Sequence, residues 1–340
     1  MSMAASVTSG GRGGATVLAI VGWLVKFVMV VVVIATVNFV LVHAAPGDPA
    51  QVIAGESGAA DEKLLAQLRA EYGLDKPYPV QLANYLERVL TLDLGYSYRQ
   101  QQPVRTLILE RLPATLLLTA TAFLLALTIG VALGVLAGIR AGTWADTLLT
   151  IFSLLLYAMP VFWLGLMLVL LFSVKLDWLP AFGYVTIGVD MSPLERLGDI
   201  ASHLALPAVS LAAIYLAIYA RLTRSSVIEV MQQDFIKTAR SKGLTQGRII
   251  ARHILRNAIL PVVTVAGMQA GALVGGAVVI ETVFAWPGLG RLIYDALLQR
   301  DYPVMLGIFL VMSVIVIMLN LVTDAIYRLI DPRVALRAAS

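Results

Sequence analysis

The chain has 340 residues, of which 59% are hydrophobic and only 14% are charged, and its formal net charge is +4. Soluble domains are about 45–50% apolar and about 25% charged, so this composition excludes an ordinary soluble protein and indicates an integral membrane protein. The sequence contains no cysteine, which excludes a disulfide framework, a thiolate metal site and a cysteine nucleophile.

Long apolar runs recur along the chain. A helix needs about 20 residues to cross about 30 Å of hydrocarbon, and runs of this length are too long for the strands of a membrane barrel. The sequence therefore predicts an all-α polytopic bundle with six membrane spans. The predicted spans are residues 24–42, 114–138, 148–172, 204–222, 258–284 and 304–327.

The distribution of charge predicts the orientation of these spans. If both termini are cytoplasmic, the inner segments carry 13 Lys/Arg against 4 Asp/Glu, and the outer segments carry 11 Lys/Arg against 15 Asp/Glu. Cytoplasmic segments of membrane proteins are enriched in Lys and Arg, so we expect cytoplasmic termini. Residues 1–23 are then a cytoplasmic extension with an interfacial helix at about 15–25, and residues 329–340 are a cytoplasmic tail.

An extracytoplasmic region, 43–111, follows the first span. Its apolar residues recur at helical spacing, which predicts two amphipathic helices at about 61–72 and 81–90. Two interpretations remain open for these helices. They either form a cap that packs on the protein's own outer surface, or they form a docking surface for a partner that delivers substrate.

The core of the protein is predicted at residues 112–328, which include the second to sixth spans. Pro160 is expected to kink the third span because proline removes a helical hydrogen bond. Two spans carry glycines at every fourth position, which allows close helix approach through plain packing or through a sliding contact. These glycines are Gly130, Gly134 and Gly138 in the second span and Gly267, Gly271 and Gly275 in the fifth.

Carboxylates are rare within the spans. Glu281 and Asp324 both fall close to a membrane interface, so we expect structural hydrogen bonding rather than proton transfer. The sequence has no GxxxxGK[ST] loop for ATP phosphates, no GxSxG elbow and no HxxxH or HExxH pair. We therefore expect neither an enzyme active site, nor a metal site, nor a cofactor in this chain.

The cytoplasmic loop 223–257 contains the stretch DFIKTARSKGLTQGRIIARHILRNAILP, which begins at Asp234. The sequence predicts a helix that ends at Gly243, a suitable C′ residue, and then a second short helix over 246–258. Six Lys/Arg lie between Lys237 and Arg256. Such a loop can rest on anionic lipid with no partner, which the charges alone favour. It can also insert as a helix–turn–helix into a groove with an acidic rim on a soluble partner.

This loop resembles the cytoplasmic loop of permease subunits of binding-protein-dependent ABC importers, whose pattern is E-A-A-x-x-x-G-x9-I-x-L-P. Ala239, Gly243 and Leu255 match that pattern, whereas Lys237 and Thr238 replace its Glu and first Ala; His253 and Arg256 replace its Ile and Pro. The segments DFIKTARSKGL and RHILRNAILPVVT are similar to the first, B-type permease of the dipeptide, oligopeptide and nickel branch. The resemblance continues through FVLVHAAPGDPA, EYGLDKPYPVQLANYL, LDLGYS, RLPATLLLT, MPVFWLG, ETVFAWPGLGRL, RDYPV and NLVTDAIYRLIDPR.

The resemblance implies a permease fold of the type I importers, located in a prokaryotic inner membrane. It implies a second, homologous permease subunit, two cytoplasmic ATPase subunits that bind ATP and Mg²⁺, and an extracytoplasmic solute-binding protein. The loop would transmit ATPase closure to the spans, and we predict that Gly243→Asp uncouples transport without unfolding the bundle. The residues expected to couple to the ATPase are Lys237, Thr238, Ala239, Arg240, Lys242, Gly243 and Leu244.

The substrate is open at this stage. Di- or oligopeptides are the expected cargo, and nickel chelates or glutathione are the alternatives within the same branch. Two other classes of protein are weaker alternatives. An autonomous secondary transporter would work without an ATPase, and a membrane scaffold would use the loop only to recruit a soluble protein.

Overall fold

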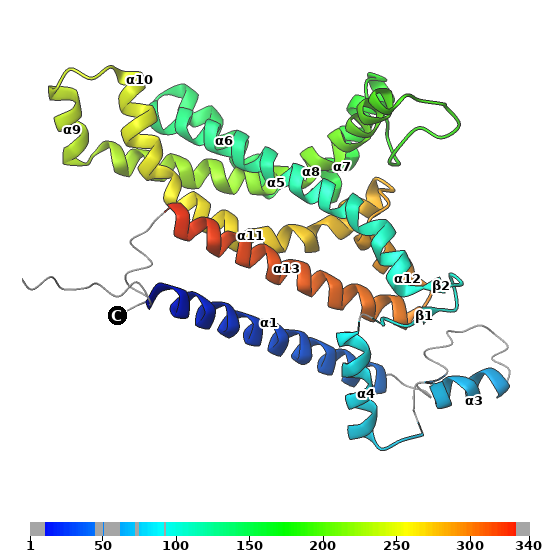
Figure 1. Ribbon diagram of the computed structural model, residues 1–340. Helices are drawn as coiled ribbons and strands as arrows, with labels where there is room; N and C mark the ends of the chain where they lie inside the picture. Colours follow the sequence, from blue (N-terminus) through cyan, green and yellow to red (C-terminus); the bar gives the residue numbers. More distant parts are fainter. Residues whose placement is uncertain (1–10, 45–49, 51–61, 72–74, 92, 331–340) are drawn as a thin grey trace, which may run out of the picture. The chain divides into compact units, whose positions relative to one another are not determined.

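A computed structural model describes residues 11–44, 50, 62–71, 75–91 and 93–330. The described chain is almost entirely helical, as the sequence predicts (Figure 1). In its N-terminal part the elements are α1 (Gly11–Ala44), α3 (Glu62–Glu71), α4 (Tyr78–Leu90), β1 (Tyr96–Ser97), β2 (Gln102–Pro103), α5 (Val104–Ile139), α6 (Trp144–Ala158), α7 (Val161–Leu168) and the π-helical η1 (Val169–Lys175). They are followed by α8 (Pro193–Met231), α9 (Asp234–Ser241), α10 (Gln246–Arg248), the π-helical η2 (Ile249–Ile254), α11 (Leu255–Val283), α12 (Leu289–Leu298) and α13 (Tyr302–Ile330).

The chain divides into two compact units. The first comprises residues 1–105 and 299–317, and the second comprises residues 106–298 and 318–340. The predicted core at 112–328 stays a prediction, and the first half of α13 belongs to the first unit.

In the first unit, α4 packs on α1 through its apolar face. Val89 of α4 joins Val31 and Ala35 of α1 and Leu310 of α13 in a buried cluster, with Tyr85 half-buried beside them. The apolar face of α4 is therefore buried within this chain, and the choice between a cap and a docking surface for the two amphipathic helices stays a prediction. The predicted interfacial helix at 15–25 does not form a separate element. Because no proline interrupts this stretch, α1 runs unbroken from Gly11 to Ala44.

Four continuous helices of the described chain are long and apolar enough to cross a membrane. They are α5, α8, the run from Gln246 to Val283 and α13 up to Thr323. The predicted third span is broken rather than kinked. The helix direction bends by 107° between α6 and the run Val161–Lys175, which comprises α7 and η1. Met159, which precedes Pro160, is extended (φ −78°, ψ 132°), as steric conflict with a following proline favours. In α1, the described apolar stretch Phe27–Leu41 is shorter than a full crossing. The span count of six stays a prediction.

The core of the second unit lies between α8 and α11, which Figure 1 shows running alongside each other. Its largest fully buried side chains include Trp286, Tyr219 and Phe284. Both helices extend beyond the predicted spans. A capping box formed by Ser192 and Glu195 starts α8. The predicted short helix at 246–258 is not separate from the fifth span, because α10, η2 and α11 form one continuous helical run.

Candidate functional site: the loop between α8 and α11

The short helix α9 stands at one end of the second unit, between the long helices α8 and α11 (Figure 1). The extended backbone of Gln233 (φ −71°, ψ 147°) separates it from α8. Asp234 lies in its first turn and Arg240 in its last, where their charges complement the helix dipole. These local signals explain why a new helix starts at Asp234 rather than α8 continuing.

The end of α9 is a Schellman motif centred on Gly243. The N–H of Gly243 donates to the carbonyl of Arg240 at 2.9 Å, and the N–H of Leu244 donates to the carbonyl of Ala239 at 3.4 Å. Gly243 has φ +72°, a left-handed conformation that residues with a β-carbon adopt only at a cost. The sequence prediction of Gly243 as the C′ residue therefore agrees with the backbone geometry.

The inner face of α9 packs against its own chain. Ile236 and Ala239 are buried together with Ile249 and Ile254 of η2 and Val227 of α8, and Leu244 packs half-buried on this cluster. Ala239 is only 5% exposed, so it joins α9 to η2, whereas Leu244 keeps part of its side chain exposed. The ATPase contacts expected at these two residues stay predictions. The small side chain of Ala239 permits this close packing.

The outer face of α9 carries the other expected contacts. Lys237, Thr238, Arg240, Lys242 and Gly243 are all exposed. Lys237 donates to Asp234 at 2.8 Å, but both side chains are largely in solvent, so the pair contributes little to stability. The outer face is therefore polar and predominantly cationic.

Phe235 is a residue of this face that the sequence interpretation missed. It is 44% exposed on a helix that is otherwise polar outside. Ile236, its neighbour, is fully buried. Phe235 lies only about 40° around the helix from buried Ala239 and about 100° from Ile236, so it stands at the border of the buried face and a helical wheel does not identify it as exposed.

An ion pair fixes α8 to α6 next to this loop. Arg224 of α8 donates to both carboxylate oxygens of Asp146 of α6, at 2.5 and 2.8 Å. Asp146 also accepts from the backbone N–H of Gly142 at 2.9 Å, and its side chain is only 6% exposed. A two-pronged contact of this kind restricts relative movement of the two helices.

The glycines of the second span lie against α8. A β-carbon at Gly130 would stand 2.9 Å from the carbonyl oxygen of Leu216. At Gly134 it would overlap the carbonyl oxygen of Ala220, and at Gly138 it would lie 2.7 Å from the Val227 side chain. The absence of side chains thus permits the close approach of α5 and α8.

The glycines of the fifth span do not share one contact. A β-carbon at Gly267 would overlap Thr323 of α13, and Gly271 is buried. Gly275, in contrast, is exposed, and among the described residues nothing lies within 4 Å of a β-carbon position there, so its expected packing role stays a prediction.

Glu281 has the structural role that the sequence suggested. Its carboxylate accepts from Thr115 of α5 at 2.7 Å and from the backbone N–H of Arg291 at 3.0 Å. A β-carbon at Gly288 or Gly290 would overlap this carboxylate or crowd it. Glu281 therefore joins α5 and α11 to the N-terminal turn of α12. The side chain of Asp324 lies outside the described residues.

Two family models together cover most of the chain. Residues 130–336 match the binding-protein-dependent transport system inner membrane component, and residues 19–119 match the N-terminal domain of such components. The chain therefore belongs to the family of binding-protein-dependent transport system inner membrane components, the permease subunits of ABC importers.

Curated relatives are similar over nearly their whole length. The chain is 39% identical to a dipeptide transport system permease protein of Alkalihalophilus pseudofirmus, over 92% of this chain and 97% of that protein. It is 42% identical to a dipeptide transport system permease protein of Escherichia coli K12, over 88% and 94%.

A solved structure of the MetNI methionine ABC transporter, in an inward-facing conformation, shares the fold with a TM-score of 0.54. That likeness covers 67% of this chain and 98% of the matched chain, at 19% sequence identity. The family models and the curated relatives show that the protein is a membrane-embedded permease subunit of an ABC importer.

Proposed function

We propose that this chain forms half of the translocation pore of an importer for di- or oligopeptides. The names of its relatives support the cargo, because the two described above are both dipeptide permeases. The proposed complex has a second, homologous permease, two cytoplasmic ATPase subunits that bind ATP and Mg²⁺, and an extracytoplasmic solute-binding protein. It lies in the inner membrane with both termini of this chain in the cytoplasm, which the excess of Lys and Arg in the predicted inner segments supports.

Within that complex, α9 is proposed to be the element that docks on an ATPase subunit. The observation that carries this proposal is the two-sided character of α9. Its inner face is buried against η2 and α8, and its exposed side chains include Phe235, at the border of the buried face, and the cations Lys237, Arg240 and Lys242. An exposed aromatic residue on a helix whose other exposed side chains are mainly cationic suits an apolar groove with an acidic rim.

The connection of α9 to the spans supports a mechanical role. Because Ile236 and Ala239 pack on η2, and η2 continues directly into α11, a displacement of α9 is transmitted to α11 without a flexible joint. On the other side, α8 ends only two residues before α9. ATP binding that closes the ATPase pair would thus shift the equilibrium between pore conformations through this one contact.

Two substitutions test the docking face. Phe235→Ala is expected to lower the amount of ATPase subunit that co-purifies with the chain, and to lower substrate uptake per ATP hydrolysed. Phe182→Ala is a matched control because Phe182 is similarly exposed, at 55%, but lies in the connection between η1 and α8. Equal ATPase recovery in both variants would contradict the docking role of Phe235.

The partners and the cargo are tested by gentle affinity purification of the chain from its native membrane, followed by mass spectrometry of proteins and retained small molecules. We expect a second permease, ATPase subunits and a binding protein with a bound peptide. Recovery of the intact chain alone, under conditions that preserve a control ABC complex, would favour an autonomous transporter or a scaffold instead.

A further inference from the structure

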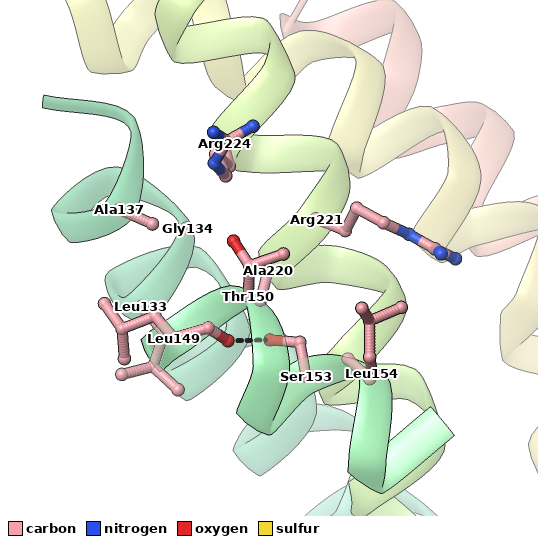
Figure 2. A pocket seen from close by; sticks show the side chains of 11 residues that line it. Leu133, Gly134, Ala137, Leu149, Thr150, Ser153, Leu154, Ala220, Arg221 and Arg224 are labelled. Carbon is pink, nitrogen blue, oxygen red and sulfur yellow. Dashed lines mark hydrogen bonds between the residues drawn. The ribbon is translucent and has the colours of Figure 1, made fainter. Parts of the chain in front are cut away.

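Helices α5, α6 and α8 line a half-open cavity of about 140 Å³ beside the Arg224–Asp146 pair (Figure 2). Small residues of α5 and α8 leave space for the cavity, and α6 supplies most of the larger apolar side chains in its wall. The lining residues are Leu133, Gly134, Ala137, Leu149, Thr150, Ser153, Leu154, Ala217, Ala220, Arg221 and Arg224.

The wall of the cavity is effectively apolar below its arginines. The Ser153 hydroxyl donates to the carbonyl of Leu149 at 2.8 Å, as the dashed line in Figure 2 marks. The Thr150 hydroxyl lies 3.5 Å from Asp146 and donates to its carboxylate. Both hydroxyls are thus engaged within α6. The remaining lining is mostly apolar, so it suits an apolar segment of a ligand.

One positive charge at the edge of the cavity is uncompensated. Arg224 is neutralised by Asp146, whereas Arg221, one turn earlier on α8, is exposed and stacks over the ring of Tyr157 at 5.1 Å. Within the part of the chain that the structure describes, no ion pair involves Arg221. A planar guanidinium is weakly hydrated and matches the geometry of a phosphate group. The second part of the ligand should therefore be a single anion.

An exposed tryptophan near the cavity indicates that it lies close to a membrane interface. Trp144, the first residue of α6, is 76% exposed, and exposed tryptophans concentrate at membrane–water interfaces. Leu149, the first α6 residue of the lining, is five residues further along, which is about 7.5 Å at the helical rise. Basic pockets between membrane helices are suited to anionic headgroups.

We propose that this cavity is a binding site for an anionic phospholipid, with the phosphodiester on Arg221 and the first part of an acyl chain between α5, α6 and α8. A free phosphate would leave the apolar wall unused, and an uncharged lipid would leave Arg221 without an anion. The site is separate from the α9 docking face and does not depend on the identity of the cargo.

The test uses the intact importer complex in a neutral detergent, with phosphatidylglycerol and phosphatidylcholine of the same chain length added separately. Native mass spectrometry measures how much of each lipid stays bound. We expect phosphatidylglycerol to be retained preferentially. Arg221→Gln should weaken its retention at least about tenfold, as the loss of a charge-assisted contact implies. Ser153→Leu, which fills the cavity, should weaken it similarly.

Arg196→Gln is the matched control, because it removes the same charge from an exposed position near the other end of α8; it should leave retention unchanged. Equal retention of both lipids, or retention that neither Arg221→Gln nor Ser153→Leu reduces, would overturn the proposal. Displacement of phosphatidylglycerol by millimolar inorganic phosphate would indicate a soluble anion instead. A complex that retains no lipid would indicate that the second permease fills the cavity, which also overturns the proposal. Arg221 is exposed, so the Arg221→Gln result does not depend on a folding defect.

Discussion

Substitutions at Gly243 separate two reasons why this glycine matters: its backbone conformation and its contact with a partner. At φ +72°, a residue with a β-carbon costs about 1–2 kcal/mol. A β-carbon there would meet no atom of the described residues within 4 Å, so no steric cost from them adds to this. Gly243→Ala should therefore raise the open population of the turn about 5- to 30-fold. The two motif hydrogen bonds, donated by the amides of residues 243 and 244, report this opening by hydrogen exchange.

Two further variants divide the effects. Asn and Asp tolerate the left-handed region better than other residues, so Gly243→Asn should keep the turn closed and support nearly normal ATP-driven uptake. Gly243→Asp should also keep the turn, but it places a negative charge among the cations that are proposed to face an acidic rim. We expect Gly243→Asp to lose uptake while the bundle unfolds at an unchanged temperature.

The measurements are amide hydrogen exchange in the purified complex and substrate uptake into proteoliposomes. ATP is supplied on the side of the proteoliposome membrane that the ATPase subunits face. If Gly243→Asn loses as much uptake as Gly243→Ala, the left-handed backbone conformation does not explain why glycine is needed at this position. Steric contact with the ATPase would explain it instead. Normal uptake by a well-expressed Gly243→Asp variant would refute the coupling role assigned to the outer face.

Three further predictions concern the packing around the site. Gly134→Ala should destabilise the protein by about 1–3 kcal/mol because its β-carbon would overlap α8. Gly275→Ala should be neutral or slightly stabilising. Equal unfolding midpoints of the two variants in urea would contradict the close approach of α5 and α8. Asp146→Asn should lower the free energy of unfolding by about 1–3 kcal/mol, since it leaves the Arg224 guanidinium without its carboxylate. In a double-mutant cycle, adding Arg224→Gln should recover part of this loss. Glu281→Gln should cost a similar amount by weakening the hydrogen bonds that hold the start of α12; unchanged thermal unfolding would show that this connection is dispensable.

Prolines show where sequence reasoning about the fold reaches its limit. Pro113, Pro207 and Pro261 all lie inside continuous helices, and only Pro160 ends one. All four lie in apolar surroundings with similar local signals. What differs is the packing of the flanking segments, which a single sequence does not contain. The sequence therefore predicts a perturbation at Pro160, but not the 107° break between α6 and α7.

The location of the candidate site and the turn at Gly243 are predictable from the sequence. Which side chains of α9 are exposed is not. The basic composition of the loop and the position of Gly243 are local features, and both agree with the structure. The burial of Ala239 depends on η2, whose π-helical turn and continuity with α11 arise from tertiary packing. The same packing decides that Phe235 is exposed while Ile236 is buried.

The central claim is that the outer face of α9 contacts an ATPase subunit, and single cysteines test it most directly. The chain contains no cysteine of its own, so each introduced thiol is unique within it. Thr238→Cys lies on the exposed face, and Ala239→Cys, one residue later, lies on the buried face. With a short thiol-reactive crosslinker in native membranes, the account predicts a covalent product between Thr238→Cys and an ATPase subunit and none with Ala239→Cys. Crosslinking from Ala239→Cys alone, or from neither position in an assembled complex, would contradict it.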